Sequence, residues 1–155
     1  MKSNKEIFIE ELNQLLADEH IKQMGTFEQH EGNTTLQHAV NVAWNSYYLS
    51  EKFHVQVDYK ALARGAMLHD YYLYDIKESG LSDYRHGISH PETALVNAEK
   101  IFTITEKERN IIRSHMWPLT FFHKPKCKEA WLVCLADKYC AFNEMILHRM
   151  NLVEA

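Results

Sequence analysis

Residues 65–70 of the chain read Gly-Ala-Met-Leu-His-Asp, a small apolar run that ends in an adjacent histidine and carboxylate. We expect this run to close a helix over residues 59–70, because Asp58 is a good N-cap for it. The pair His69-Asp70 combines an imidazole and a carboxylate, which suit a borderline divalent cation such as Mn²⁺, Fe²⁺, Co²⁺, Ni²⁺ or Zn²⁺. A helix end with two solvated polar residues would give the same dipeptide, so the choice between a metal-ligand pair and a solvated helix end depends on the rest of the chain.

The composition predicts one ordinary globular domain. A chain of 155 residues suits a single core, and 46% hydrophobic and 25% charged residues are typical of such proteins. Only 5 Gly and 3 Pro argue against a strand-and-turn architecture and leave room for long helices. A formal charge of −4 argues against binding to nucleic acid polymers, although it permits a small phosphorylated substrate.

The cysteines and the N-terminal residues indicate the compartment. The 3 cysteines are an odd number and none forms a C-x-x-C pair, which fits reduced thiols better than disulfides or structural zinc. The first 17 residues are charged and lack the apolar core of a signal peptide. Since no run is apolar enough to span a bilayer, we expect a cytoplasmic protein without a membrane partner.

Apolar spacing predicts two further helices in the first third of the chain. A helix over residues 3–17 would cover the core. A second helix, over residues 35–53, would be capped by Thr34 or Thr35. His38 lies in its first turn, where it would either bond to a neighbouring carbonyl or act as a ligand on a buried helix.

The second half of the chain carries three more helix signals. Proline fits the first helical position, so we expect His90-Pro91 to open a helix with His90 at or beside its N-cap. Thr105 begins a capping box, and His115 would lie near the end of the helix that follows. The last helix is expected over residues 128–150.

The last predicted helix contains a carboxylate in an apolar run. We expect Leu135 and Phe142 to be buried, with Asp137 between them. A buried carboxylate is costly unless it is paired or binds a metal. The structural alternative is an ion pair between Asp137 and Lys60 or Arg64.

Two polar segments are candidates for substrate binding. Residues 71–90 are the least regular part of the chain, and Lys77, Arg85 and His86 in that segment are candidate phosphate contacts. A second basic loop contains His123 and Lys124. In each segment, the alternative is a set of solvated charges.

The candidate ligands form an ordered set, and their local contexts resemble a known family. The contexts are Ala66-Met67-Leu68-His69-Asp70, His90-Pro91, Ile111-Ile112-Arg113-Ser114-His115 and Leu135-Ala136-Asp137-Lys138, preceded by His38 at the start of a helix. Over about residues 36–139 the sequence resembles the HD-domain superfamily of metal-dependent phosphohydrolases. Small stand-alone bacterial members are the most similar.

The resemblance implies an all-α, single-domain fold. It implies an HD-domain helical bundle of about six helices over residues 1–155, with residues 1–24 packed on a metal-binding core of residues 36–139. It also implies one or two divalent ions per chain, drawn from Mn, Fe, Co, Ni, Zn or Mg. The implied ligands of the first metal are His38, His69, Asp70 and Asp137, and those of the second are His90 and His115 with Asp70 bridging.

The resemblance further implies hydrolysis of a small phosphate ester or anhydride, with a nucleotide as the leading candidate. A metal-activated water would attack phosphorus, with Asp70 and His69 at the catalytic centre. Many members follow His-Asp with a small residue or glycine and then a lysine, whereas residues 71–77 read Tyr-Tyr-Leu-Tyr-Asp-Ile-Lys. The Gly-Tyr-Pro signature of cyclic-di-GMP phosphodiesterases is absent, which argues against that substrate.

Two rival interpretations remain at this point. The first is a non-catalytic HD module that binds metal or nucleotide and acts as a sensor or scaffold. The second is a helical protein whose histidines are satisfied in the core without any metal. A homodimer is compatible with each interpretation.

Overall fold

Side-chain caps set the beginnings of most helices. Ser3, Thr34 and Thr105 each accept a hydrogen bond from the backbone N–H three residues later, within a capping box. Asp58 and Ser82 cap two more helices through the same kind of bond. The predicted caps at Thr34, Asp58 and Thr105 are therefore confirmed.

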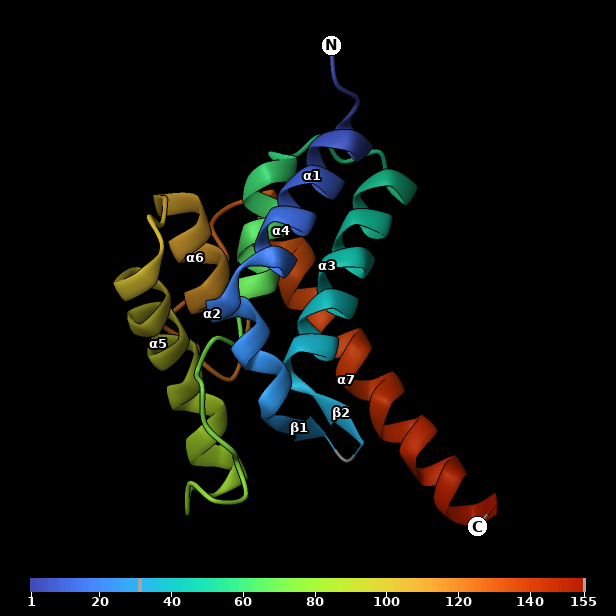
Figure 1. Cartoon of the computed structure of the whole chain (residues 1–155), viewed down its shortest axis with the longest axis vertical. Helices are drawn as coiled ribbons and strands as arrows, with labels where there is room; N and C mark the ends of the chain where they lie inside the picture. Colours follow the sequence, from blue (N-terminus) through green and yellow to red (C-terminus); the bar gives the residue numbers. More distant parts are fainter. Residues whose placement is uncertain (31, 155) are drawn as a thin grey trace.

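The computed structural model describes residues 1–30 and 32–154, and the regular elements are helices joined by loops, apart from one small hairpin (Figure 1). The elements are α1 (Asn4–Ala17), α2 (Glu19–Lys22), η1 (Gln23–Thr26), β1 (Glu28–His30), β2 (Asn33–Thr34), α3 (Thr35–Lys52), α4 (Tyr59–Leu68), α5 (Asp83–Ile101), α6 (Glu106–Ser114) and α7 (Lys128–Glu154). Strands β1 and β2 are antiparallel. The predicted all-α single domain is confirmed, with seven α-helices among the described residues.

Helix α4 occupies the middle of the bundle. Eight of its ten residues are buried, and it packs against α1, α3, α6 and α7. Figure 1 shows α4 behind α1, between α6 and α3. Phe8 and Leu12 of α1 are buried in the same core, so the first helix covers the core as expected.

Gly65 permits a close approach between α4 and α6. A Cβ atom at this position would lie 2.5 Å from Ile111 Cδ1 and 2.7 Å from Ile111 Cγ2. Helix α4 also packs against α3, but Gly65 faces α6. Since His69 and Asp70 directly follow α4 and His115 directly follows α6, this contact sets the distance between them.

The prediction that His90-Pro91 opens a helix is wrong. Helix α5 begins at Asp83, and Pro91 lies inside it. Ser82 supplies the N-cap two turns upstream, and the carboxylate of Asp83 in the first turn complements the helix dipole. His90 therefore lies in the helix interior, where its side chain is buried.

The prediction that Leu135 and Phe142 are buried is also wrong. Their exposed fractions are 55% and 62%. Asp137 and Val133 of the same helix face the bundle, and Leu135 and Phe142 fall on the opposite side. Figure 1 shows the C-terminal half of α7 projecting beyond the other helices. Among the described helices, none has the length and apolarity that a membrane span requires.

Candidate metal centre

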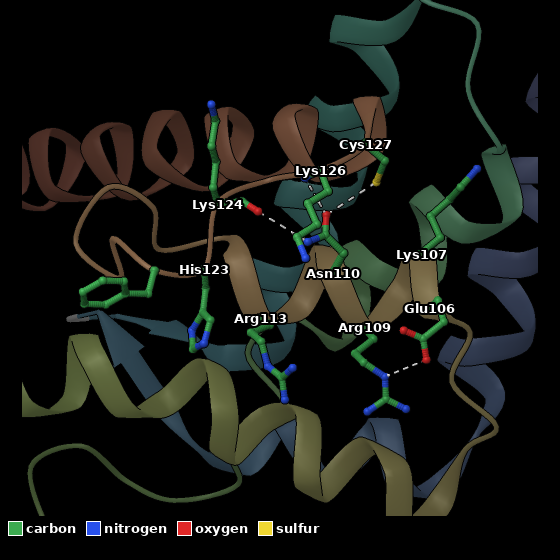
Figure 2. Close-up of a pocket in the computed structure, with 10 residues that line it drawn as sticks. Glu106, Lys107, Arg109, Asn110, Arg113, His123, Lys124, Lys126 and Cys127 are labelled. Carbon is green, nitrogen blue, oxygen red and sulfur yellow. Dashed lines mark hydrogen bonds and ion pairs between the residues drawn. The ribbon is translucent and has the colours of Figure 1, made fainter.

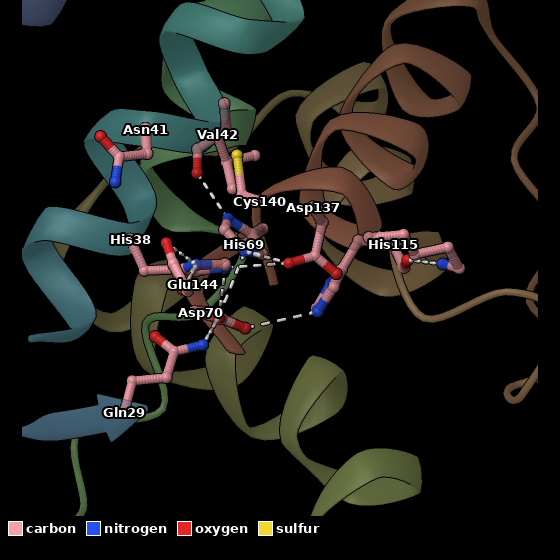
Figure 3. Close-up of polar contacts among 12 residues, drawn as sticks. Gln29, His38, Asn41, Val42, His69, Asp70, His115, Asp137, Cys140 and Glu144 are labelled. Carbon is pink, nitrogen blue, oxygen red and sulfur yellow. Dashed lines mark hydrogen bonds and ion pairs between the residues drawn. The ribbon is translucent and has the colours of Figure 1, made fainter. Parts of the chain in front are cut away.

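Six polar side chains converge beyond the C-terminal end of α4. Figure 3 labels all of them except His90. All of them are buried, and five different helices or helix ends supply them. They are His38 in the first turn of α3, His69 and Asp70 after α4, His90 within α5, His115 after α6, and Asp137 within α7. The structure thus brings together all six residues that the resemblance implies as ligands.

The four imidazoles share one orientation. In His69, His90 and His115, the Nδ1 atom lies 2.6, 2.8 and 2.7 Å from the carbonyl oxygen of a residue three or four positions earlier. A carbonyl oxygen only accepts hydrogen bonds, so Nδ1 donates and, in the neutral ring, Nε2 keeps a lone pair. In His38, Nδ1 faces the carboxylate of Glu144 instead. All four Nε2 atoms therefore point into the cluster.

The first group of ligand atoms comes from His38, His69, Asp70 and Asp137. His38 Nε2 lies 2.9 Å from Asp137 Oδ1 and 3.7 Å from Asp70 Oδ2. His69 Nε2 lies 3.2 Å from Asp70 Oδ2 and 3.5 Å from Asp137 Oδ1. Two imidazole nitrogens and two carboxylate oxygens thus surround one point.

The second group comes from Asp70, His90 and His115. Asp70 Oδ1 lies 3.1 Å from His90 Nε2 and 3.3 Å from His115 Nε2. Asp70 therefore turns one carboxylate oxygen toward each group. This is the arrangement of a carboxylate that bridges two cations.

The donor set fits divalent cations. His69 Nε2 and Asp70 Oδ1 are buried, and neither makes a hydrogen bond within the part of the chain that the structure describes. The Nε2 atoms of His90 and His115 lie only 2.8 Å apart, although each Nδ1 is the donor of its ring. Two facing lone pairs at this distance need a cation or a proton to hold them together. Imidazole and carboxylate ligands suit borderline divalent metals.

The protonation of the cluster reflects strong coupling between imidazoles and carboxylates. Burial alone lowers the pKa of His38, but its hydrogen bonds to Asp137 and Glu144 raise that pKa to about 9. The carboxylates of Asp70 and Asp137 likewise outweigh burial and raise the pKa of His69. Burial raises the carboxyl pKa of Asp70 and Asp137, yet the surrounding imidazoles bring both well below the usual range. The cluster therefore keeps its carboxylates ionised and attracts positive charge.

A cavity of about 800 Å³ opens onto the cluster. Asp70, His90 and Asp137 form part of its wall. The other lining residues include the apolar Ile76, Met116, Pro118 and Leu119 and the polar Lys77, His86 and Lys138. The volume is in the range of sites that bind small molecules, about 300–1,000 Å³.

The structure separates the predicted substrate contacts. Lys77 and His86 line the cavity beside the cluster. Arg85 is exposed in the first turn of α5 and does not line this cavity. His123 and Lys124 line a second cavity of about 380 Å³, between α6 and residues 122–127 (Figure 2). None of the six ligand candidates belongs to the described lining of that second cavity.

The arginines of the second cavity are already paired with carboxylates. Arg113 makes a two-point contact with Glu92, at 2.9 and 3.0 Å. Arg109 pairs with Glu99 and Glu106. Because these cations are compensated, the second cavity carries less free positive charge than the basic sequence suggests.

Two residues that contact the cluster were not predicted from the sequence. Glu144 on α7 contacts His38 Nδ1, and Gln29 Nε2 on β1 donates a hydrogen bond to Asp70 Oδ2 at 2.6 Å. The spacing of seven residues between Asp137 and Glu144 was a usable signal, since it places both on one helix face. Gln29 gave no such signal, because only the fold brings the hairpin to the cluster. The alternative pairing of Asp137 with Lys60 or Arg64 is not observed, since both cations pair with Glu11.

A comparison with protein-family models identifies the family. The model of the HD domain matches residues 35–141, more than half of the chain. The chain belongs to the HD domain family. The match contains all six ligand candidates, so the resemblance noted from the sequence is confirmed. Neither a curated protein nor a solved structure matches the chain.

Membership in the HD domain family supports a metal-binding role for the cluster. HD domains bind divalent metal ions and are generally hydrolases, and the two buried groups of this HD domain can hold such ions. The number and the identity of the ions remain predictions.

Proposed function

We propose that this HD-domain protein is a metal-dependent phosphohydrolase that acts on a small phosphate ester or anhydride, with a nucleotide as the leading candidate. The observation that carries the proposal is the pair of ligand groups that share Asp70 beside an 800 Å³ cavity. His38, His69, Asp70 and Asp137 would hold one ion, and His90 and His115 would hold a second with Asp70. Two such ions supply an activated water and neutralise charge during in-line attack on phosphorus.

Other residues of the cavity can bind the substrate. Lys138 brings positive charge to the wall beside the cluster, whereas Lys77 in the same wall pairs with Glu28 at 3.6 Å. Lys138 is fixed in place, because its Nζ donates to the carbonyl oxygen of His115 at 3.0 Å. The apolar side chains of Met116 and Leu119 offer a surface for the part of the substrate that carries no phosphate.

His86 can donate a hydrogen bond from the cavity wall without adding charge. Burial and the neighbouring His90 lower its pKa to about 4, so the ring is neutral at neutral pH. The hydroxyl of Tyr74 lies 2.7 Å from His86 Nδ1. When Tyr74 donates this bond, the proton of the ring stays on Nε2, where it can reach a phosphate oxygen.

The test is the variant Asp70→Asn, assayed for bound metal and for release of phosphate from nucleotides and simple phosphate esters. Because Asp70 serves both groups, we expect metal content and turnover to fall together. Glu19→Gln makes the same chemical change at a side chain that is 83% exposed, and it should alter neither quantity. Turnover at the wild-type rate in Asp70→Asn would refute the mechanism. Metal-loaded wild-type protein that binds nucleotides without hydrolysing them would favour the sensor interpretation.

A further inference from the structure

Two carboxylates on one face of helix α7, those of Asp137 and Glu144, contact the imidazole of His38. Asp137 and Glu144 are seven residues apart, which is two helical turns, and each side chain is only 12% exposed. His38 lies between them (Figure 3). Its Nε2 lies 2.9 Å from Asp137 Oδ1, and its Nδ1 lies 3.1 and 3.0 Å from the two carboxylate oxygens of Glu144.

Glu144 differs from the groups that hold the other three imidazoles. His69, His90 and His115 donate from Nδ1 to neutral backbone carbonyls, whereas His38 donates to a charged carboxylate. A carboxylate behind a metal-bound imidazole fixes the ring orientation and tautomer and makes the ligating nitrogen more basic. His38 is therefore the one ligand among these four whose partner can be changed by a side-chain substitution.

We infer that Glu144 is a positioning residue that holds His38 Nε2 toward the first metal position and strengthens binding there. The inference rests on the proposed function only in requiring a metal at the first group. The second group, from Asp70, His90 and His115, does not contain His38. Loss of Glu144 should therefore weaken one metal position more than the other.

The experiment is a Zn²⁺ titration of the full chain against a chromophoric chelator, which resolves the tighter and weaker sites. Glu144→Ala should weaken binding at one site by about 10- to 100-fold, as other residues behind metal-bound histidines do. Glu144→Gln should lose less, because the amide oxygen still accepts the bond from Nδ1. Glu106→Gln removes one negative charge at an exposed side chain, and its affinities should equal those of the wild type.

A second readout follows the ring itself. In ¹⁵N spectra of the Zn²⁺-loaded protein, the His38 signals should indicate a proton on Nδ1, and Glu144→Ala should shift them while those of His90 stay unchanged. Equal Zn²⁺ affinities in wild type, Glu144→Ala and Glu144→Gln would overturn the inference and leave the proposed function standing. If Glu144→Ala fails to fold, the Zn²⁺ affinity of Glu144→Gln is compared with that of the wild type instead, and equal affinities would overturn the inference. Failure of the wild type to bind any metal would instead refute the proposed function.

The opposite face of α7 supports a second, independent inference. It carries an apolar stripe in which five residues are between 40% and 62% exposed and the sixth is partly exposed. The stripe consists of Trp131, Leu135, Tyr139, Phe142, Ile146 and Met150. Its spacing of four, four, three, four and four residues reads the same in both directions, so two copies in antiparallel orientation would present the same spacing to each other.

The area and the charges of the stripe also fit a second copy of this chain. At roughly 200 Å² for each fully exposed side chain, the five most exposed residues of the stripe and their neighbours Met145 and Leu147 expose about 750 Å². A standard interface buries about 800 Å² per partner. In the antiparallel alignment Tyr139 faces Phe142 of the partner copy, and Lys138 faces Asn143 rather than another cation.

We propose that two copies of the chain pair through this stripe, with their α7 helices antiparallel. The pairing would cover the part of α7 that projects from the bundle in Figure 1, where a short helix without packing is marginal in water. Lys138 and Ala141, next to the stripe, line the cavity beside the metal centre. The partner copy would therefore lie close to the entrance of that cavity.

The experiment is analytical ultracentrifugation of the full chain over a range of concentrations. The wild type should sediment as a dimer, and Phe142→Glu should raise the dissociation constant at least tenfold. Phe122→Glu makes the same change at a phenylalanine that is 94% exposed and lies off the stripe, and it should remain dimeric. A monomeric wild type at every concentration, or a Phe142→Glu variant that dimerises normally, would overturn the proposal. Tyr139→Glu provides a second variant if Phe142→Glu proves poorly folded.

Discussion

Replacing Gly65 by alanine should destabilise the fold and disturb the metal centre at the same time. The new Cβ would lie 2.5, 2.7 and 2.9 Å from the Cδ1, Cγ2 and Cβ atoms of Ile111. Carbon atoms prefer separations of about 3.5–4.0 Å, so α4 and α6 would have to move apart by roughly 1 Å. His69 and Asp70 follow α4 and His115 follows α6, so the same movement would loosen the second ligand group.

The expected loss of stability is about 2 kcal/mol. Alanine is favoured over glycine in a helix by about 1 kcal/mol, which opposes the clash. Overpacking of a core costs about 1–3 kcal/mol, and a clash with three atoms of a buried branched side chain belongs at or above the upper end. For a chain of this size, a net loss of 2 kcal/mol lowers the Tm by about 4–8 °C.

The assay is thermal unfolding together with Zn²⁺ affinity. Gly25→Ala is the matched control, because its Cβ would lie 3.5 Å from Leu36 Cδ2, an ordinary contact. It should leave the Tm unchanged or slightly higher. In an Ile111→Val background, which lacks the nearest clashing atom, Gly65→Ala should cost less than in the wild type. An unchanged Tm in Gly65→Ala, or an equal cost in both backgrounds, would refute the reasoning.

Three further predictions concern an ion network, a helix cap and the proton balance of the metal centre. Arg64→Ala should lower the free energy of unfolding by about 3 kcal/mol in urea, because it leaves the buried carboxylates of Glu108 and Glu11 without their guanidinium partner. Thr105→Ala should cost about 1 kcal/mol in the same assay through loss of the cap of α6, without changing metal stoichiometry. Metal affinity should rise with pH between 6 and 8, because the raised pKa of His38, about 9, means that its ring holds a proton that the metal must displace. Calorimetry in buffers of different ionisation enthalpy should detect that proton, and a pH-independent affinity would contradict the prediction.

Local chemistry made part of the fold and site predictable from the sequence. A capping box involves residues three positions apart, so the starts of α3 and α6 could be inferred without any knowledge of tertiary contacts. Asp137 stood out because a carboxylate inside an apolar run needs a partner. The pairing of His69 with Asp70 required only adjacency in the sequence. The structure brings these residues together, in agreement with the ligand set that the resemblance implies.

Features that depend on distant contacts were not predictable in this way. His123 and Lys124 belong to a basic loop, but whether that loop reaches the cluster depends on how α6 and α7 pack. Pro91 is acceptable at a first helical position and also inside α5, so the residue type alone could not place the start of that helix. Gln29 reaches Asp70 across 41 positions of sequence, through a hairpin that carries no chemical signal of its own.

Helix α7 shows why an unusual distribution of polarity is informative. Its carboxylates Asp137 and Glu144 face the protein, and its large apolar side chains Leu135, Tyr139 and Phe142 face outward. Both placements are costly unless something compensates them, since a buried carboxylate requires positive charge and an exposed apolar stripe requires cover. The inward face is compensated by the imidazole of His38 and, in our proposal, by a metal ion. The outward face requires an equivalent compensation, and the symmetric spacing of its apolar residues makes a second copy of the same helix the partner that fits best.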